Sequence, residues 1–275
     1  MLRICLAASG EEVVALDAGH FEAVVAQYGS TVASLKHYLA GRHFPKRFSR
    51  FQLRILGEGD SMEMEDAESI TPPLNLQLIL MNHLPPDEER DGSFVESCGG
   101  RVHEVVENLK ALQNPNVVAD GISALMRAAS YGREEVVRLL LEAGADTEWR
   151  DDDFERTALH LAAQYNRSEV VRILLEFGAD MEAVDGEGAG PLHLAAQGGH
   201  TAVAQLLLDS GADNEAEDRW SQRPLHYAAE NDRLSVVQLL VEAGVDKNAL
   251  DEAGRTAAQL ATQEGSIAAA ELLQD

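Results

Sequence analysis

Three histidines, His160, His193 and His226, recur at one regular interval along the chain. Neutral imidazole is a common zinc ligand, and zinc requires its nitrogen ligands about 2.0–2.1 Å away. If each histidine belongs to its own stacked unit, helix-packing distances place successive rings roughly 10 Å apart. One metal cannot bridge that separation. The spacing therefore predicts structural histidines whose rings hydrogen-bond to neighbouring backbone, and no metal site.

Two other residue groups could carry chemistry. Asp151, Asp152 and Asp153 are adjacent carboxylates, but the ligand spacing and glycine of an EF-hand loop are absent, so we interpret them as a solvated loop tip. Cys5 and Cys98 lie in different regions, which favours free thiols in a reducing compartment. The sequence has no G-x-S-x-G, P-loop or H-E-x-x-H motif, so we expect no enzyme and no cofactor.

The histidines belong to a repeated segment. It reads RTALHLAA at Arg156–Ala163, GPLHLAA at Gly190–Ala196 and RPLHYAA at Arg223–Ala229, with looser copies at Ser123–Ala129 and Thr256–Thr262. Its second alanine recurs at Ala129, Ala163, Ala196 and Ala229, and the first of these intervals is longer than the others by a single insertion. A period of about 33 residues predicts an array of stacked units, each too small to bury its own core.

One unit, Asp185–Asp218, shows the expected anatomy. A short first helix through Leu192–Ala196 ends near Gly199. A second helix carries Val203, Leu206 and Leu207 at helical spacing, and a hairpin-like finger follows. The paired alanines are small enough for adjacent first helices to approach closely.

These features resemble the ankyrin repeat, as do VVRLLLEAGAD at Val136–Asp146 and VVRILLEFGAD at Val170–Asp180. The resemblance covers residues 101–275 and implies an α-solenoid. We divide it into a partial N-terminal unit at 101–119, repeats at about 120–151, 152–185, 186–218 and 219–251, and a C-terminal unit at 252–275. The first helix of the partial unit is expected to be missing or degraded, and the last unit to lack a full second helix, as a cap or a truncated array.

Residues 1–84 do not share the repeat. Alternating apolar residues predict a hairpin over Leu2–Leu16 and strands at Gln52–Leu56 and Leu74–Met81, with a helix at Thr31–Leu39 between them. This order resembles a ubiquitin-like β-grasp domain. The fold class is thus an α+β β-grasp domain followed by an α-solenoid of ankyrin repeats, with residues 85–100 as a linker rich in Pro, Gly, Ser and acid.

Two departures bear on what the ubiquitin-like resemblance implies. Arg54 stands where ubiquitin has the isoleucine of its recognition patch, so binding to the usual ubiquitin receptors does not follow. The last strand runs into Asn82–Pro86 instead of a terminal Gly-Gly, and Gly99-Gly100 lies in the expected linker. Conjugation to lysines is therefore not expected. Docking to a ligase or the proteasome stays open as an alternative function.

The ankyrin resemblance implies a non-catalytic scaffold or adaptor that binds proteins on its fingers and concave face. Both tryptophans fall on fingers, and Trp149 stands where the next units have alanine. Trp, Tyr and Arg dominate interface energetics. The aromatics can instead pack against their own fingers, and both alternatives stand. The predicted partner-binding residues are Tyr131, Trp149, Arg150, Phe154, Arg156, Tyr165, Glu187, Arg219, Trp220, Gln222 and Asn231.

Net charge constrains the partner. The formal charge is −25, and residues 85–275 hold 37 acidic against 15 basic residues. Such a field repels nucleic acid. It indicates either solubility of a long exposed surface or a basic protein partner. No stretch reaches the ~18 apolar residues of a membrane span. We expect a monomer in the cytoplasm, with the nucleus as an open alternative.

Overall fold

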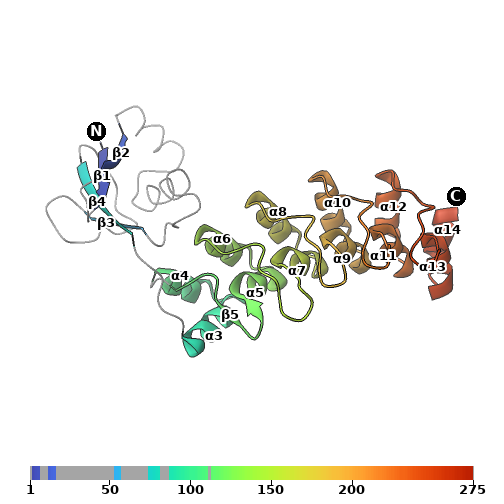
Figure 1. Ribbon diagram of the computed structural model, residues 1–275, viewed down its shortest axis with the longest axis horizontal. Coiled ribbons are helices and arrows are strands. Elements are labelled where there is room, and N and C mark those ends of the chain that lie inside the picture. Colours follow the sequence, from blue (N-terminus) through green and yellow to red (C-terminus); the bar gives the residue numbers. More distant parts are fainter. Residues whose placement is uncertain are drawn as a thin grey trace. The chain divides into compact units, whose positions relative to one another are not determined.

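The computed structural model describes residues 2–6, 12–16, 53–56, 74–80, 87–110 and 113–274 (Figure 1). The helix predicted at Thr31–Leu39 lies outside the described residues. Two groups of elements are described, a β-sheet and a helical array, and each is treated by itself.

Four strands form one sheet in the N-terminal part: β1 (Leu2–Leu6), β2 (Glu12–Leu16), β3 (Leu53–Leu56) and β4 (Leu74–Leu80). Their order is β2-β1-β4-β3. The outer pairs are antiparallel, whereas β1 and β4 are parallel, with Ile4 opposite Leu76. The period of two correctly predicted all four strands. A parallel pair needs a long crossover between its strands, so β4 returns beside β1 only after the intervening chain.

A helix, α3 (Glu88–Ser97), occupies most of the segment expected to be a linker. That prediction is wrong. Phe94 is 1% exposed and Val95 is fully buried, and α3 packs against α5 (Ala124–Tyr131). The sequence EERDGSFVES contains Gly92 and few apolar residues, so its own helical tendency is low. Tertiary packing on the array determines this helix.

The unit whose first helix is expected to be missing or degraded therefore has a first helix of ten residues. First helices of neighbouring units pack on one another along the array, and α3 packs on α5 in the same way. Helix α4 (Val102–Lys110) follows it. Arg133 Nε donates to Gly99 O at 2.7 Å, a bond that later units repeat at the ends of their first helices.

The first finger is a tight hairpin of β5 (Val118–Ala119) and β6 (Ile122–Ser123). Asp120 and Gly121 between them have φ of 51° and 72°. A two-residue turn with both φ values positive matches the right-handed twist of the strands, and Asp-Gly tolerates it best. Ser123 then caps α5 by accepting from Met126 N.

The remaining helices form two rows (Figure 1). First helices of successive units lie in one row and pack on one another, and the second helices lie in the other. The first helices are α5, α7 (Ala158–Gln164), α9 (Pro191–Gly198), α11 (Pro224–Glu230) and α13 (Ala257–Glu264). The second helices are α6 (Glu134–Glu142), α8 (Ser168–Glu176), α10 (Thr201–Asp209), α12 (Leu234–Glu242) and α14 (Ile267–Gln274).

The core follows the repeated pattern. Ala162, Ala163, Ala195 and Ala196 are fully buried on the first helices. Val, Ile and Leu of the second helices fill the space beside them, as Leu207 does at 0% exposure. Small residues permit the close approach of first helices, and the stack shares one continuous apolar core.

The last unit has a second helix of nearly usual length. Helix α14 spans eight residues, against nine in α12, and buries Ala269, Ala270 and Leu273. The expectation of an incomplete second helix is therefore wrong. Alanine contributes little apolar periodicity to a sequence pattern, and packing against α12 and α13 compensates for it.

Candidate protein-interaction surface

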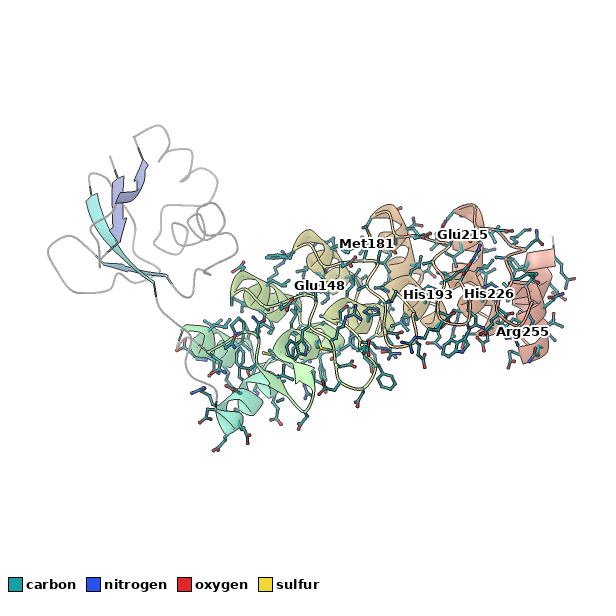
Figure 2. All side chains as sticks on the ribbon, viewed as in Figure 1. Glu148, Met181, His193, Glu215, His226 and Arg255 are labelled. Atoms are coloured by element: carbon teal, nitrogen blue, oxygen red, sulfur yellow. The ribbon has the colours of Figure 1, made fainter. Side chains whose placement is uncertain are left out.

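The three recurring histidines are buried structural residues. His193 and His226 are labelled in Figure 2 and come from successive units of the array. Nδ1 of His160, His193 and His226 accepts from the backbone N–H of Thr157, Gly190 and Arg223, at 3.1–3.2 Å. Nε2 of His160 lies 3.2 Å from Ala189 O, and Nε2 of His193 lies 3.2 Å from Gln222 O. Each of these Nε2 contacts joins one unit to the next, which confirms the predicted backbone role for His160 and His193.

This geometry determines the charge of these rings. Nδ1 accepts an N–H, so the proton of His160 lies on Nε2 and the ring is neutral. Burial lowers the pKa of His160 to about 4, and the charge of Asp185 only partly opposes that effect. Burial likewise lowers the pKa of His193 and of His226. These imidazoles stay neutral at pH 7 and hold backbone groups instead of exchanging protons.

The outer helices α13 and α5 are capped without histidine. Gln259 takes the histidine position of the last unit, and its Oε1 accepts from Thr256 N at 3.0 Å. In α5, Met126 stands at the histidine position, and the helix is capped by a different bond, in which Ser123 Oγ accepts from Met126 N. The histidine position thus supplies an acceptor for the backbone N–H before the helix, and the imidazoles of His160 and His193 add a bond to the following unit.

A second inter-unit contact runs along the bases of the fingers. Glu148 Oε1 accepts from Asp180 N at 3.0 Å, and Glu182 Oε1 accepts from Asp213 N at 3.0 Å. Glu215 repeats the contact with Asp246 N at 2.6 Å. Sequence reasoning missed this ladder. Its signal is the acid two positions after each finger aspartate, as in DTE, DME and DNE.

Each later finger is anchored by a buried aspartate. Asp185 accepts from Glu187 N and Ala189 N, and Asp218 accepts from Trp220 N and Gln222 N. Asp251 is held by the backbone and guanidinium of Arg255, and these bonds outweigh burial and lower its pKa. Neighbouring fingers also join by backbone bonds, such as Arg219 N to Glu187 O at 3.0 Å. The fingers form one continuous surface.

The finger that starts at Asp151 is one residue longer than those behind it. Between the anchor aspartate and the next residue with positive φ it holds Asp152, Asp153 and Phe154, where the following finger holds two residues. Asp151 Oδ1 accepts from Phe154 N at 2.6 Å. The extra residue falls within the longer first interval of the repeat, between Ala129 and Ala163, and Phe154 beside it is 53% exposed.

Five aromatic residues of the predicted binding surface are exposed: Tyr131, Trp149, Phe154, Tyr165 and Trp220, which we call the aromatic set. Their exposed fractions lie between 40% and 53%. Trp149 is exposed, whereas Ala183 and Ala249 at equivalent positions are 5% and 8% exposed. The aromatic set is therefore not folded into the fingers' own interior.

Two of the predicted arginines are engaged within the array. Arg150 donates to Glu155 O and Val184 O, which ties adjacent fingers together. Arg156 Nε donates to Asp185 Oδ2 at 3.2 Å, its NH1 donates to Gln164, and its guanidinium lies 4.7 Å from the centre of the Phe154 ring. Both side chains hold the fingers in place, and their role in binding stays a prediction.

Of the other predicted binding residues, some are engaged within the array and others are exposed. Asn231 ends α11 and donates its amide to Tyr227 O at 2.9 Å. Arg219 and Glu187 are exposed on adjacent finger tips. Gln222 is half-buried and lines a cavity of about 480 Å³ with Trp220, Asp251 and Arg255. The binding role of these residues also stays a prediction.

A larger cavity of about 510 Å³ lies between the first two fingers and the helices α5 and α7. Phe154 and Tyr165 of the aromatic set line it, together with Asp120, Asp152, Asp153 and Arg127. Tyr131 lines a separate cavity of about 390 Å³ with Arg127 and Arg101. The predicted cluster of aromatics is therefore divided, and Trp149 lines none of these three cavities.

Comparison with known families agrees with this geometry. The family described as Ankyrin repeats (3 copies) matches residues 95–185, 125–218 and 192–275. The chain belongs to the ankyrin-repeat family. No curated protein matches it. The match begins within α3, and ankyrin repeats are general protein–protein interaction modules.

Metal ligands, thiols and long apolar helices are the remaining features of the ankyrin array that bear on function. In the described part of the chain, no group of three or more His, Cys, Asp or Glu side chains could hold a metal ion. Cys98 is fully buried, and burial raises its pKa to about 12, so it stays a protonated thiol. No helix within the described ranges is long and apolar enough to cross a membrane.

Proposed function

We propose that this chain is a non-catalytic scaffold or adaptor that binds a protein partner through its ankyrin fingers and concave face. The observation that carries the proposal is the exposure of the aromatic set. Aromatic side chains supply large contact area at low entropic cost and are enriched at interface centres. Its members belong to fingers or to the ends of first helices, which neighbouring units leave uncovered.

The test replaces both finger tryptophans in the full chain. Trp149→Ala with Trp220→Ala removes two exposed rings and no side-chain hydrogen bond in the described part of the chain. We expect proteins captured from a lysate by the immobilised wild-type chain, identified by mass spectrometry, to be lost by this variant. Phe177→Ala is the matched control, because Phe177 is 43% exposed at the end of α8 and outside the fingers. Equal capture by wild type and the double variant would contradict the proposal.

A second candidate is a ubiquitin-pathway adaptor that docks through residues 1–84. The observation that favours it is the order β2-β1-β4-β3 with a parallel central pair, the arrangement that a hairpin, crossover and returning strand would produce. Under this candidate, the full chain captures ligase or proteasome subunits, and deletion of residues 1–84 removes them while other partners remain. Retention of those subunits after the deletion would exclude it.

A further inference from the structure

The cavity between the first two fingers differs in charge from the rest of the finger surface. We call it the acidic finger cavity, lined by Asp120, Asp152, Asp153, Phe154, Tyr165 and Arg127 among others. Its volume, about 510 Å³, lies within the range of ordinary ligand sites. Phe154 and Tyr165 are half-exposed, so ring surface is available at its opening.

The carboxylates of this cavity lack cationic partners. Asp120, Asp152 and Asp153 are exposed, and none of them forms an ion pair with a described residue. Gly121 of the first finger approaches the second so closely that an added Cβ would lie 3.3 Å from Asp152 Oδ2. Like charges held at adjacent fingertips repel each other, and an external cation would relieve that repulsion.

Several acids of the later fingers are neutralised within the array. Arg156 pairs with Asp185, Arg223 pairs with Glu215 and with Glu217 at 2.9 Å, and Arg255 pairs with Asp251 at 2.7 Å. Arg156 also lines the acidic finger cavity, but its guanidinium is already shared between Asp185, Gln164 and the Phe154 ring. Glu187 and Glu252 are also exposed on fingers, so the cavity is distinguished by Asp120, Asp152 and Asp153 gathered beside the exposed rings of Phe154 and Tyr165.

Arg127 is the second unusual residue. The equivalent first-helix positions hold Leu161, Leu194, Tyr227 and Leu260, whereas here a half-buried arginine lines the cavity. Its buried Nε has no hydrogen-bond partner among the described residues. A buried donor without an acceptor is costly, and the same side chain contributes to the lining of this cavity and of the cavity beside Tyr131. A main-chain carbonyl oxygen is an acceptor that a guanidinium can bind without a second negative side chain.

We propose that the acidic finger cavity binds a basic, extended segment of the partner protein. An Arg or Lys side chain of that segment lies between the carboxylates of Asp152 and Asp153 and the rings of Phe154 and Tyr165. Such a position combines charge attraction with cation–π contact. Arg127 donates to a main-chain carbonyl of the same segment. The inference rests on the proposed partner-binding function and specifies the chemistry of the partner.

The test measures fluorescence anisotropy of a labelled peptide of alternating arginine and glycine added to the full chain. A peptide with glutamate in place of arginine is the comparison. We expect the basic peptide alone to bind, with affinity that falls as salt rises. Asp152→Asn with Asp153→Asn should weaken binding about tenfold. Arg127→Lys keeps the charge but loses the planar array of donors, and should weaken binding about threefold.

The matched control separates a site from the general negative field. Glu134→Gln with Glu135→Gln removes the same charge from the exposed first turn of α6, which does not line the cavity. We expect less than a twofold change, roughly the effect of distant screened charges. Equal weakening by the two double variants would overturn the proposal, as would tighter binding of the glutamate peptide or no binding of the basic one. None of these results touches the tryptophan capture test, which can still support partner binding elsewhere on the array.

Discussion

The fingers at Asp151–Arg156 and Asp218–Arg223 are built on equivalent anchors but present different surfaces. In the second, Asp218 holds two backbone amides and the Tyr227 hydroxyl, and Arg223 neutralises two glutamates. In the finger at Asp151–Arg156, Asp151 accepts from Phe154 N. This finger is one residue longer and has two further aspartates at its tip, which form no ion pair with a described residue. The difference shows that the shared interior supports the fingers while single residues at the tips set their charge.

The comparison predicts that substitutions in the shared interior greatly lower the stability of the fold, whereas substitutions at the finger tips lower it little. Leu207→Ala removes a fully buried side chain of α10 and should lower the free energy of unfolding by about 2–5 kcal/mol. The control is Leu250, which is 55% exposed on a finger. Leu250→Ala should change the free energy of unfolding by less than about 0.5 kcal/mol. Urea unfolding followed by circular dichroism measures both. Equal effects would refute the separation between interior and surface.

The next largest effect on stability is expected from acid, because low pH protonates the buried His160. The folded-state pKa of His160 is about 4, below the ordinary 6.5, so the unfolded state binds the proton first. Its contribution is complete above pH 6.5 and is lost as the pH falls toward 4, amounting to about 3 kcal/mol at most. Urea unfolding across this pH range measures the loss. His160→Gln, which copies the cap of Gln259, should flatten the dependence, and an unchanged slope would show that His160 does not titrate this way.

The acidic ladder should have a moderate effect. Glu182→Ala leaves Asp213 N without its carboxylate acceptor at the base of a finger, and should cost about 1 kcal/mol because the site is exposed. Glu187→Ala on a fingertip is the matched control, since its backbone carbonyl, not its side chain, accepts from Arg219 N. Thermal unfolding distinguishes them. If the two variants have the same midpoint of thermal unfolding, the ladder does not stabilise the stack.

The smallest change is expected at the acidic fingertip. Asp152→Asn with Asp153→Asn should leave the free energy of unfolding within about 0.5 kcal/mol of wild type, because neither side chain has a cationic partner in the described part of the chain. A slight gain would follow from reduced repulsion. Chemical unfolding in the absence of peptide checks this, and a large loss would mean that these carboxylates are structural.

Several features were predictable because they depend on local pattern. Leu74–Leu80 alternates with period two and forms β4, and the longer interval between Ala129 and Ala163 located the longer finger. The separation of His160 and His193 by one unit excluded a shared metal, and their rings link backbones as expected.

Other features escaped sequence reasoning because they depend on contacts distant along the chain. Glu88–Ser97 has a weak helical pattern, and its burial against α5 makes it a helix. Arg156 has the residue type of an interface anchor, yet Asp185, 29 residues away, engages its guanidinium. The ladder of Glu148, Glu182 and Glu215 likewise becomes visible only when successive fingers are stacked.

By itself, the sequence determined the period, the small residues between first helices and the family of the array. These follow from short-range patterns that every unit must satisfy to stack on the next. Tertiary structure alone decided which polar side chains are satisfied and which remain available. Arg127, Asp152 and Asp153 resemble other charged residues in the sequence, and only the folded neighbours show that, within the described residues, Arg127 Nε has no hydrogen-bond partner and the two aspartates no ion pair.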